Sequence, residues 1–461
     1  MKKKIHLNAF TQCSICHHSK GQWKNPNDGS SLGYKDLNYW VDLAKTLERG
    51  GFAALFLADV HGTYNVYQGS RDTAVRHTVQ FPSNDPTLII SAMAYATRHL
   101  GFACTYSTSY FAPYQAAKVF STLDHLTNGR IAWNVVTSYL PDANENFEIG
   151  DQMSHDERYE RAEEYLEVVY KLWEHSWEED AAIRDKVNDV HNDPSKVHEI
   201  NHQGTWFNVP GPHMCEPSLQ RTPVLFQAGQ SGRGVAFAAR HAEAVFALMA
   251  DINHCRVSAE KVRTAVANEG RAAEHVKIFP GITPIVGESD SHAQEKFEQM
   301  KEYSSPEGAL ALFSGWVGVD LSTVTSDMLL SDKKSEAIQG LLSYFEVVDP
   351  DREWTVEAMG EQISIGSVMP KFIGSPTTIA DELEVWMEGC EIDGFNIAPA
   401  VQPTGFAEFV DNVVPELRKR GRMPETYASE TLREHYFGNG VKRLPSDHIA
   451  HRALPSWKQS P

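Results

Sequence analysis

The feature that most constrains the fold is an alternation of short apolar runs with longer amphipathic segments, repeated along the chain. Residues 53–60, AALFLADV, form a near-continuous apolar run that is typical of a strand covered on both faces, as in parallel sheets. The segment before it, residues 36–49, has apolar residues at steps of three and four and is followed by Gly50-Gly51. This spacing predicts a helix that ends at the glycine pair.

The same pattern continues to about residue 418 and predicts eight strands, each followed by a helix. The expected strands are 5–10, 53–60, 100–105, 130–136, 223–228, 244–248, 276–286 and 394–398. The expected helices are 36–49, 85–99, 112–126, 155–173, 234–241, 258–269, 291–303, 375–388 and 406–418. Eight βα repeats without a break in composition favour one α/β domain over residues 1–461, a (β/α)₈ TIM barrel, rather than an open sheet of five or six strands.

Three stretches are too long for the minimal repeat: about 61–84, 175–222 and 305–374, the last with a Ser/Asp/Lys-rich segment around Ser331 to Ser335. Long loops in a compact domain are usually functional, and βα loops of a barrel lie over its ligand site. We therefore expect long insertions over the C-terminal face. Residues 423–461 are polar and irregular, and we expect a tail that packs on the surface or on another subunit.

Composition excludes several classes of protein. The chain has 42 Lys plus Arg against 61 Asp plus Glu, a formal charge of -19, so its field repels nucleic acid. No apolar run approaches the ~20 residues of a membrane helix, and the N-terminus lacks the apolar region of a signal peptide. Six scattered cysteines fit a reducing compartment. We expect a soluble cytoplasmic protein.

Polar residues gather where the expected strands end, which is the ligand-binding end of a barrel. They are Asp59, Thr105, Ser107, Asn134, Thr137, Ser138, Tyr139, Gly229 and Ser231.

Two expected helix starts have features of an anion site. Gly229, Gly232 and Gly234 follow a strand and open a helix, so that backbone N–H groups and the helix dipole could hold a phosphate, although a tight βα turn explains them equally well. His155 and Tyr159 lie four residues apart on one helix face and could point at one anion. Ser154 and Glu157 also predict a capping box there.

Cys13-Ser14-Ile15-Cys16-His17 has the spacing of a haem-attachment motif. Haem attachment requires export, for which no signal exists, and one C-x-x-C pair lacks the ligands of a structural zinc site. We interpret the segment as a first βα loop that lines a pocket. The chain has no nucleophile elbow, Walker loop, H-E-x-x-H or kinase motif set, so hydrolase, phosphotransferase and metalloprotease functions lack their parts.

Five segments occur in a characteristic combination: Asn8-Ala9-Phe10, Asp36-Leu37-Asn38-Tyr39-Trp40, Leu57-Ala58-Asp59, the run STLDHL at 121–126 and the run GRIAWNVVTS at 129–138. With these segments the chain resembles the bacterial-luciferase-like flavin monooxygenases over nearly its whole length. Within them it is most similar to the nitrilotriacetate and dibenzothiophene-sulfone monooxygenase branch, and there to long-chain alkane monooxygenase.

The resemblance implies a barrel enzyme that uses reduced FMN from a separate NAD(P)H:flavin reductase. In such enzymes O₂ forms a C4a-(hydro)peroxyflavin that inserts one oxygen atom into a small organic substrate. The family's FMN contacts fall on Asp59, Thr105, His155, Tyr159 and Ser231, with Asn134, Thr137 and Ser138 nearby. A homodimer or homotetramer is also expected from the family.

Catalytic or substrate contacts are expected at Tyr64, Gln80 and Tyr139, with His17 and His61 as proton donors. The alkane enzyme is expected to have His where this chain has Tyr139, so alkane specificity does not transfer. Alkanes, sulfides, sulfones and amines remain open as substrates; only Arg71 and Arg76 in the first insertion offer partners for a polycarboxylate. Two alternatives also remain: a deazaflavin-dependent oxidoreductase and a non-catalytic flavin-binding protein.

Overall fold

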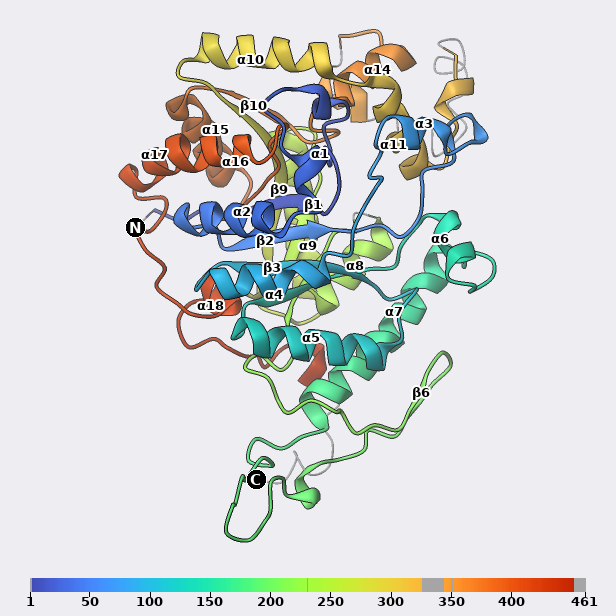
Figure 1. Ribbon diagram of the computed structural model, residues 1–461, viewed down its shortest axis with the longest axis vertical. Helices are drawn as coiled ribbons and strands as arrows, with labels where there is room; N and C mark the ends of the chain where they lie inside the picture. Colours follow the sequence, from blue (N-terminus) through green and yellow to red (C-terminus); the bar gives the residue numbers. More distant parts are fainter. Residues whose placement is uncertain (1, 230, 326–343, 350, 452–461) are drawn as a thin grey trace.

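The centre of the molecule is a closed barrel of parallel strands. The computed structural model describes residues 2–229, 231–325, 344–349 and 351–451, and within them eight strands form the ring (Figure 1). They are β1 (His6–Gln12), β2 (Ala54–Ala58), β3 (Gly101–Ser107), β4 (Ile131–Val136), β7 (Val224–Gln227), β8 (Ala244–Ala247), β9 (Lys277–Val286) and β11 (Gly394–Ile397). Each pairs in parallel with the next, and β11 joins β9 to β1. The predicted (β/α)₈ barrel is confirmed.

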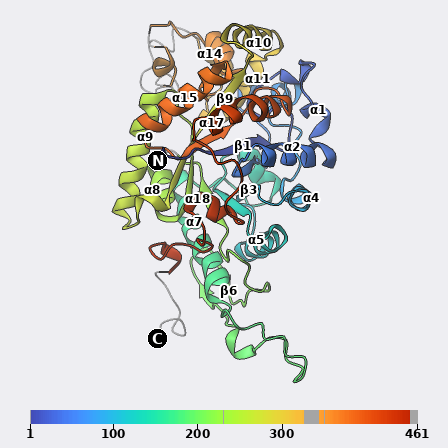
Figure 2. The same cartoon turned by 90° about the vertical axis from the view of Figure 1, so that its left-hand side faces the viewer.

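Helices surround this ring, as Figure 2 also shows. Those that follow the barrel strands are α2 (Leu37–Arg49), α4 (Thr87–Ala96), α5 (Pro113–Thr127), α7 (His155–Tyr170), α8 (Gly232–His241), α9 (Ile252–Asn268), α10 (Asp290–Tyr303), α15 (Pro376–Gly389), α16 (Thr404–Glu408) and α17 (Val414–Lys419). Most boundaries lie within two residues of expectation, and two helices differ by more. The helix α9 begins six residues before the expected 258, because Asp251 caps it by accepting a hydrogen bond from the His254 N–H. The helix α4 is shorter than the expected 85–99 at both ends.

The inside of the barrel is filled by side chains. Phe56 packs edge-on against Phe226 and Phe246, with ring centroids 5.4 and 5.7 Å apart, and small residues such as Ala103 and Ala132 leave room for these rings. The barrel is therefore a packed core rather than a pore, and a ligand must bind at its rim.

The first and third insertions gather at the carboxyl ends of the strands. The first carries α3 (Asp72–Arg76), and the third carries α11 (Pro306–Val317) and α14 (Val356–Ile363). Together with α6 (Pro141–Asn146), α3 and α11 lie on the right of Figure 1, beyond the ends of β2 and β3. The third insertion also adds a strand that sequence reasoning missed, β10 (Lys371–Gly374), which pairs with the end of β9. The segment around Ser331 to Ser335 lies outside the described residues.

Most of the second insertion forms an arm that projects from the barrel at the bottom of Figures 1 and 2. It contains a short antiparallel hairpin, β5 (His202–Gln203) with β6 (Asn208–Val209). The arm does not reach the rim at which the other two insertions meet.

The C-terminal tail closes the amino end of the barrel instead of lying only on the surface. Its helix α18 (Leu432–Phe437) places Arg433 against Glu243, with Nε and Nη2 donating to the two carboxylate oxygens at 2.7 and 2.9 Å. Both side chains are 0% exposed. Beside them the Tyr436 hydroxyl donates to Asn8 Oδ1 at 2.6 Å. Polar residues that suggested a surface tail are thus paired inside the molecule.

We predict that Arg433→Met lowers the free energy of unfolding by about 3–5 kcal/mol, because it leaves the Glu243 carboxylate buried without its counter-ion. Denaturant titration measures the change. The double variant with Glu243→Met should recover most of the loss. The ion pair of Lys419 with Glu416 provides the control: the Lys419 side chain is 78% exposed, so Lys419→Met should cost less than about 1 kcal/mol. An equally small effect of Arg433→Met would contradict a buried, paired role for the tail.

Candidate active site

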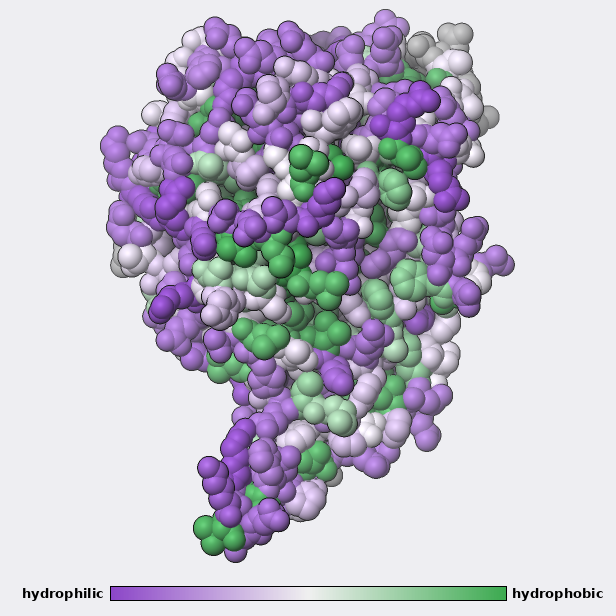
Figure 3. Space-filling view, viewed as in Figure 1, coloured by the Kyte–Doolittle hydropathy of each residue, from purple (hydrophilic) through white to green (hydrophobic). Residues whose placement is uncertain are grey.

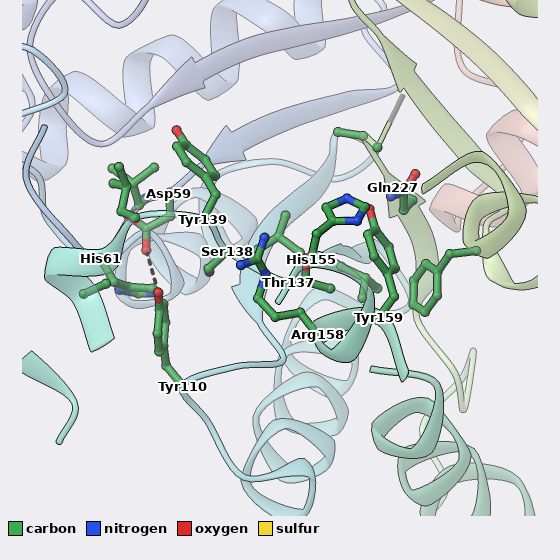
Figure 4. Close-up of a pocket in the computed structure, with 18 residues that line it drawn as sticks. Asp59, His61, Tyr110, Thr137, Ser138, Tyr139, His155, Arg158, Tyr159 and Gln227 are labelled. Atoms are coloured by element: carbon green, nitrogen blue, oxygen red, sulfur yellow. Dashed lines mark hydrogen bonds and ion pairs between the residues drawn. The ribbon is translucent and has the colours of Figure 1, made fainter. Parts of the chain in front are cut away.

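A cavity of about 300 Å³ opens at the carboxyl ends of β2, β4 and β7, between α6 and the first turn of α7. Figure 4 shows Asp59, His61, Tyr110 and Tyr139 at one end of it and His155, Tyr159 and Gln227 at the other, with Thr137, Ser138 and Arg158 between them. Eight of the predicted site residues therefore line one cavity: Asp59, His61, Thr137, Ser138, Tyr139, His155, Tyr159 and Gly229.

One end of the cavity is formed by the N-termini of two helices. Ser231 caps α8 by accepting from the Gly234 N–H at 3.0 Å, and its Oγ lies 3.3 Å from Nε2 of His155 in the first turn of α7. Tyr159 packs edge-on against His155, with ring centroids 5.1 Å apart, and its hydroxyl lies close to Ser231 and Gln227. The predicted capping box of Ser154 and Glu157 is present. The two helix starts expected to face an anion therefore face each other.

Glycines after β7 and in the first turn of α8 allow this close approach. A Cβ at Gly229 would lie 2.6 Å from the Tyr159 hydroxyl, and one at Gly234 would lie 2.9 Å from it. A Cβ at Gly232 would meet nothing within 4 Å. Gly229 and Gly234 are thus required for packing, whereas Gly232 faces open space beside the N-terminus of α8.

Sequence reasoning missed Arg158, which lines the cavity between His155 and Tyr159. Its Nη1 donates to the Met153 carbonyl at 3.0 Å, while Nε is buried and has no hydrogen-bond partner. A cation in the first turn of a helix opposes the helix dipole, and that conflict was the available signal for an anion ligand. Gln227 was also missed, although it is the last residue of β7.

Asp59 and His61 follow β2 at the other end of the cavity. The two side chains approach to 3.7 Å, between Oδ2 and Nε2, and the Val60 N–H donates to Oδ1 of Asp59. Burial, reinforced by the charge of Asp85, raises the pKa of Asp59 to about 8. Burial also lowers the pKa of His61. Both groups are therefore mainly uncharged at neutral pH.

The three predicted substrate contacts are joined by hydrogen bonds. The Tyr64 hydroxyl donates to Gln80 Oε1 at 2.8 Å and lies 2.5 Å from the Tyr139 hydroxyl. Tyr64 and Gln80 are buried, whereas the ring of Tyr139 borders the cavity. Burial raises the pKa of Tyr139 to about 12 and also raises the pKa of Tyr64. Both phenols therefore keep their protons and can act as hydrogen-bond donors.

Comparison with known proteins agrees with this geometry. Residues 17–393 match the family described as luciferase-like monooxygenase. The chain belongs to this family. It is 49% identical to long-chain alkane monooxygenase of Geobacillus thermodenitrificans over 98% of both chains, and 46% identical to dimethyl-sulfide monooxygenase of Hyphomicrobium sulfonivorans over 98% of this chain and 94% of that protein. It is 38% identical to dibenzothiophene-sulfone monooxygenase of Rhodococcus erythropolis over 94% and 96% of the two.

Solved structures of two relatives superpose closely on this luciferase-like monooxygenase. Long-chain alkane monooxygenase gives a TM-score of 0.91, with 98% of this chain and all of that chain covered. The Hyphomicrobium protein DmoA gives 0.92, with 98% and 96% covered. The predicted resemblance and the predicted enzyme class, a monooxygenase, are confirmed.

Other predicted residues of the monooxygenase lie around the cavity rather than on its wall. Thr105 and Asn134 are buried inside the barrel, where Asn134 Nδ2 donates to Thr105 Oγ1 at 2.9 Å. Ser107 lies at the end of β3, with its Oγ 2.8 Å from Oγ of Ser138 on the cavity wall. These residues support the rim, and their contact with a ligand stays a prediction.

The first loop of the monooxygenase is buried beside the barrel mouth. His17 is 3% exposed, and neither ring nitrogen has a hydrogen-bond partner. Burial lowers its pKa well below the usual value, so neutral imidazole rather than imidazolium faces the mouth. Burial likewise raises the pKa of Cys13 to about 12 and raises that of Cys16, so both remain thiols, which are poor metal ligands. The role of His17 as proton donor stays a prediction.

The described helices of the monooxygenase include none with the length and apolar character needed to cross a bilayer.

We predict that Asp59→Asn stabilises the monooxygenase increasingly as pH rises. With a folded pKa of about 8 against ~3.9 unfolded, the native protein retains a proton that the unfolded chain releases, so this group lowers stability progressively from about pH 4 to about pH 8 and equally above that range. The difference in unfolding free energy between variant and wild type should grow over this range and then level off. A difference independent of pH would contradict the buried, protonated carboxyl.

Proposed function

We propose that this monooxygenase binds reduced FMN in the cavity at the barrel rim and uses it with O₂ to add one oxygen atom to a small, uncharged organic substrate. The phosphate would lie between the starts of α7 and α8, and the ring would reach toward Asp59 and Tyr139. The observation that carries the proposal is the convergence of Ser231, Tyr159 and His155 with the unpartnered Nε of Arg158.

The donor set at the two helix starts fits a phosphate. A serine hydroxyl, a phenol and a guanidinium with a free buried nitrogen can all donate to phosphate oxygens, and helix N-termini favour anions. Gly232 adds a backbone position with open space in front of it. Without an anion, Arg158 opposes the dipole of α7 and its Nε stays unsatisfied, so the bound phosphate would relieve both.

The other end of the cavity suits a flat, largely apolar ring system. Val136, Leu140 and Ala143 line it, and His61 packs edge-on against Tyr110 and Phe147, with ring centroids 5.5 Å apart in both pairs. These groups would keep water from the reacting atoms. Protonated Asp59 could donate a hydrogen bond to the ring, which an ionised carboxylate could not.

Bound reduced FMN supplies two electrons for the activation of O₂, so that one oxygen atom enters the substrate and the other leaves as water. The chain's own residues orient the reactants and hold protons. The hydroxyl of Tyr139 keeps its proton at neutral pH and lies on the cavity wall, where it can donate to an oxygen atom of the reacting group.

The uncharged state of the site favours a neutral substrate. Burial keeps His17 and Asp59 mainly uncharged, and the phenols are protonated. Arg71, in the first insertion, is mostly exposed and lies 3.9 Å from Asp142. A polycarboxylate would therefore lack counter-ions and a protonated amine would lack a carboxylate partner. An alkane, a sulfide or a sulfone suits the site better.

We further propose a separate NAD(P)H:flavin reductase as the source of reduced FMN and the cytoplasm as the place of action. The cavity at the barrel rim is proposed for FMN, and the sequence has no dinucleotide-binding fingerprint with which the chain could bind NAD(P)H and reduce the flavin itself. All six cysteines are free thiols, which fits a reducing compartment.

An exposed apolar face supports the expected homo-oligomer. The helix α4 is apolar on all sides, with Leu88 77% and Tyr95 95% exposed, and Leu126 of the neighbouring α5 is 58% exposed. Figure 3 shows hydrophobic surface gathered over these helices. An apolar face of this kind on a soluble enzyme is typical of an interface, and a second copy presents the same face for two-fold packing.

We predict that Leu88→Glu with Tyr95→Arg converts the oligomer to a monomer, since both side chains would carry charge into the interface. Size-exclusion chromatography with light scattering measures the change. Val187→Arg on the arm, where Val187 is 91% exposed, should leave the oligomer intact. A monomeric wild type, or dissociation by Val187→Arg alone, would contradict this assignment of the face.

We predict that Ser231→Ala and Tyr159→Phe each weaken FMN binding about ten- to hundredfold, and more in the double variant, because one hydrogen bond to a charged group is worth about 1.5–3 kcal/mol. Fluorescence titration with FMN measures the affinity. The matched control is Ser289→Ala, which removes the equivalent cap of α10, where Ser289 accepts from the His292 N–H at 3.2 Å. Unchanged affinity in the double variant, or an equal loss in the control, would remove the phosphate site.

The activity itself is tested by supplying reductase, NADH, FMN and a series of alkanes, sulfides and sulfones. Substrate-dependent oxygen consumption with a product heavier by one oxygen atom is expected. Tight FMN binding without oxygen consumption would instead indicate a flavin-binding protein.

A further inference from the structure

One short helix forms part of the wall at the apolar end of the cavity. The helix α6 contributes Ala143 and, at its N-cap, Leu140 to this wall. On either side of it the backbone passes through the left-handed region, at Ser138 and at Glu148, each with a φ of 55°. Residues other than glycine seldom adopt this conformation, and hinges are typically a few residues at the ends of an element. We call residues 138–150 the α6 flap.

The start of the α6 flap is anchored to the loop after β2. Both the backbone N–H and the hydroxyl of Thr63 donate to Oδ2 of Asp142, at 2.8 and 2.9 Å, and Asp142 is buried. A Cβ at Gly62 would lie 2.9 Å from the backbone nitrogen of Ala143, so the two segments are in close contact. Because hydrogen bonds to a carboxylate are stronger than those between neutral groups, this end of the flap is firmly held.

The far end of the α6 flap is held by an aromatic ring. Phe147 stacks on Tyr110, with ring centroids 4.7 Å apart and planes 10° from parallel, and packs edge-on against His61 at 5.5 Å. The backbone N–H groups of residues 147–149 donate to residues 143–145, inside the flap itself. Since each ring contact contributes little free energy, this end can open at a small cost.

The two rings that Phe147 contacts belong to the cavity wall. His61 and Tyr110 line the cavity and lie together at its apolar end, with ring centroids 5.5 Å apart (Figure 4). Phe147 packs on both rings without lining the cavity itself. Its ring therefore fixes two wall residues and the far end of the flap at the same time.

A coenzyme that comes from a separate reductase must enter and leave the cavity in every catalytic cycle, and water must be kept out in between. A wall anchored at one end and held by ring contacts at the other meets both needs. We propose that α6 is the gate of the cavity and that Phe147 is the positioning residue that latches it closed against Tyr110 and His61. This inference rests on the proposed flavin-dependent function.

The first test measures the release of FMN from the full-length protein by stopped-flow fluorescence after rapid dilution of the complex. Phe147→Ala should speed release about five- to tenfold, because one stacked and one edge-on ring contact to the wall are lost. Phe147→Leu keeps apolar volume at this position but cannot stack, so it should also speed release. Phe147→Tyr keeps the ring and should retain the wild-type rate.

The matched control is Tyr427→Ala. Tyr427 stacks on His99 in nearly the same geometry, with ring centroids 4.8 Å apart and planes 11° from parallel. His99 precedes β3, so this stack lies at the amino end of the barrel, opposite the cavity. Loss of this second stack should leave the rate of FMN release unchanged.

Turnover with reductase, NADH, FMN and a dialkyl sulfide gives a second readout. If the gate stays open, water enters, and reduced FMN passes its two electrons to O₂ to form hydrogen peroxide instead of oxygenated product. Phe147→Ala should raise the ratio of peroxide to oxygenated product about five- to tenfold, since the closed state is less populated by the same factor. Phe147→Tyr and Tyr427→Ala should keep the wild-type ratio.

The outcomes separate the two proposals. If wild type neither binds FMN nor oxygenates any sulfide or alkane, the proposed function is overturned. If wild type does both, and Phe147→Ala leaves the release rate and the peroxide ratio unchanged or Tyr427→Ala changes them equally, the gate is overturned while the function stands.

Discussion

Closure of the parallel strands into a ring is the constraint on which the rest of the structure depends. A closed parallel barrel has its carboxyl ends at one rim, and here rings such as Phe56, Phe226 and Phe246 fill the space below that rim. Polar side chains at strand ends then have no room inside and must project into the mouth. Asp59, Ser138 and Gln227, from three different strands, reach the same cavity for this reason.

At the mouth, burial rather than ion pairing sets the chemistry. Asp59 and His17 lose their charge because they lie among apolar and aromatic groups, and the phenols of Tyr64 and Tyr139 stay protonated for the same reason. The guanidinium of Arg158 lies near the helix starts of α7 and α8, where a phosphate would balance it. The cavity is thus divided into an anion-binding end and an uncharged end, as a flavin and a neutral substrate require.

Sequence patterns predicted the features that depend on local spacing. Apolar runs such as residues 53–60 located the strands, and the spacing of His155 and Tyr159 at a helix start predicted a shared face, which Ser231 joins at the start of the next helix. Contacts between insertions were beyond such rules, because neither periodicity nor a motif places Gly315 against the ring of Tyr64 across about 250 residues. The four-residue strand β10 and the burial of Arg433 were missed for the same reason, since each depends on a partner supplied by a distant segment.

A crystal structure of the protein with bound FMN tests the central claim most directly. The phosphate is predicted within hydrogen-bond distance of Ser231 and Tyr159 and beside Arg158, with the isoalloxazine ring extending toward Asp59 and Tyr139. A flavin with its phosphate elsewhere, or a cavity that stays empty at saturating FMN, would contradict the claim.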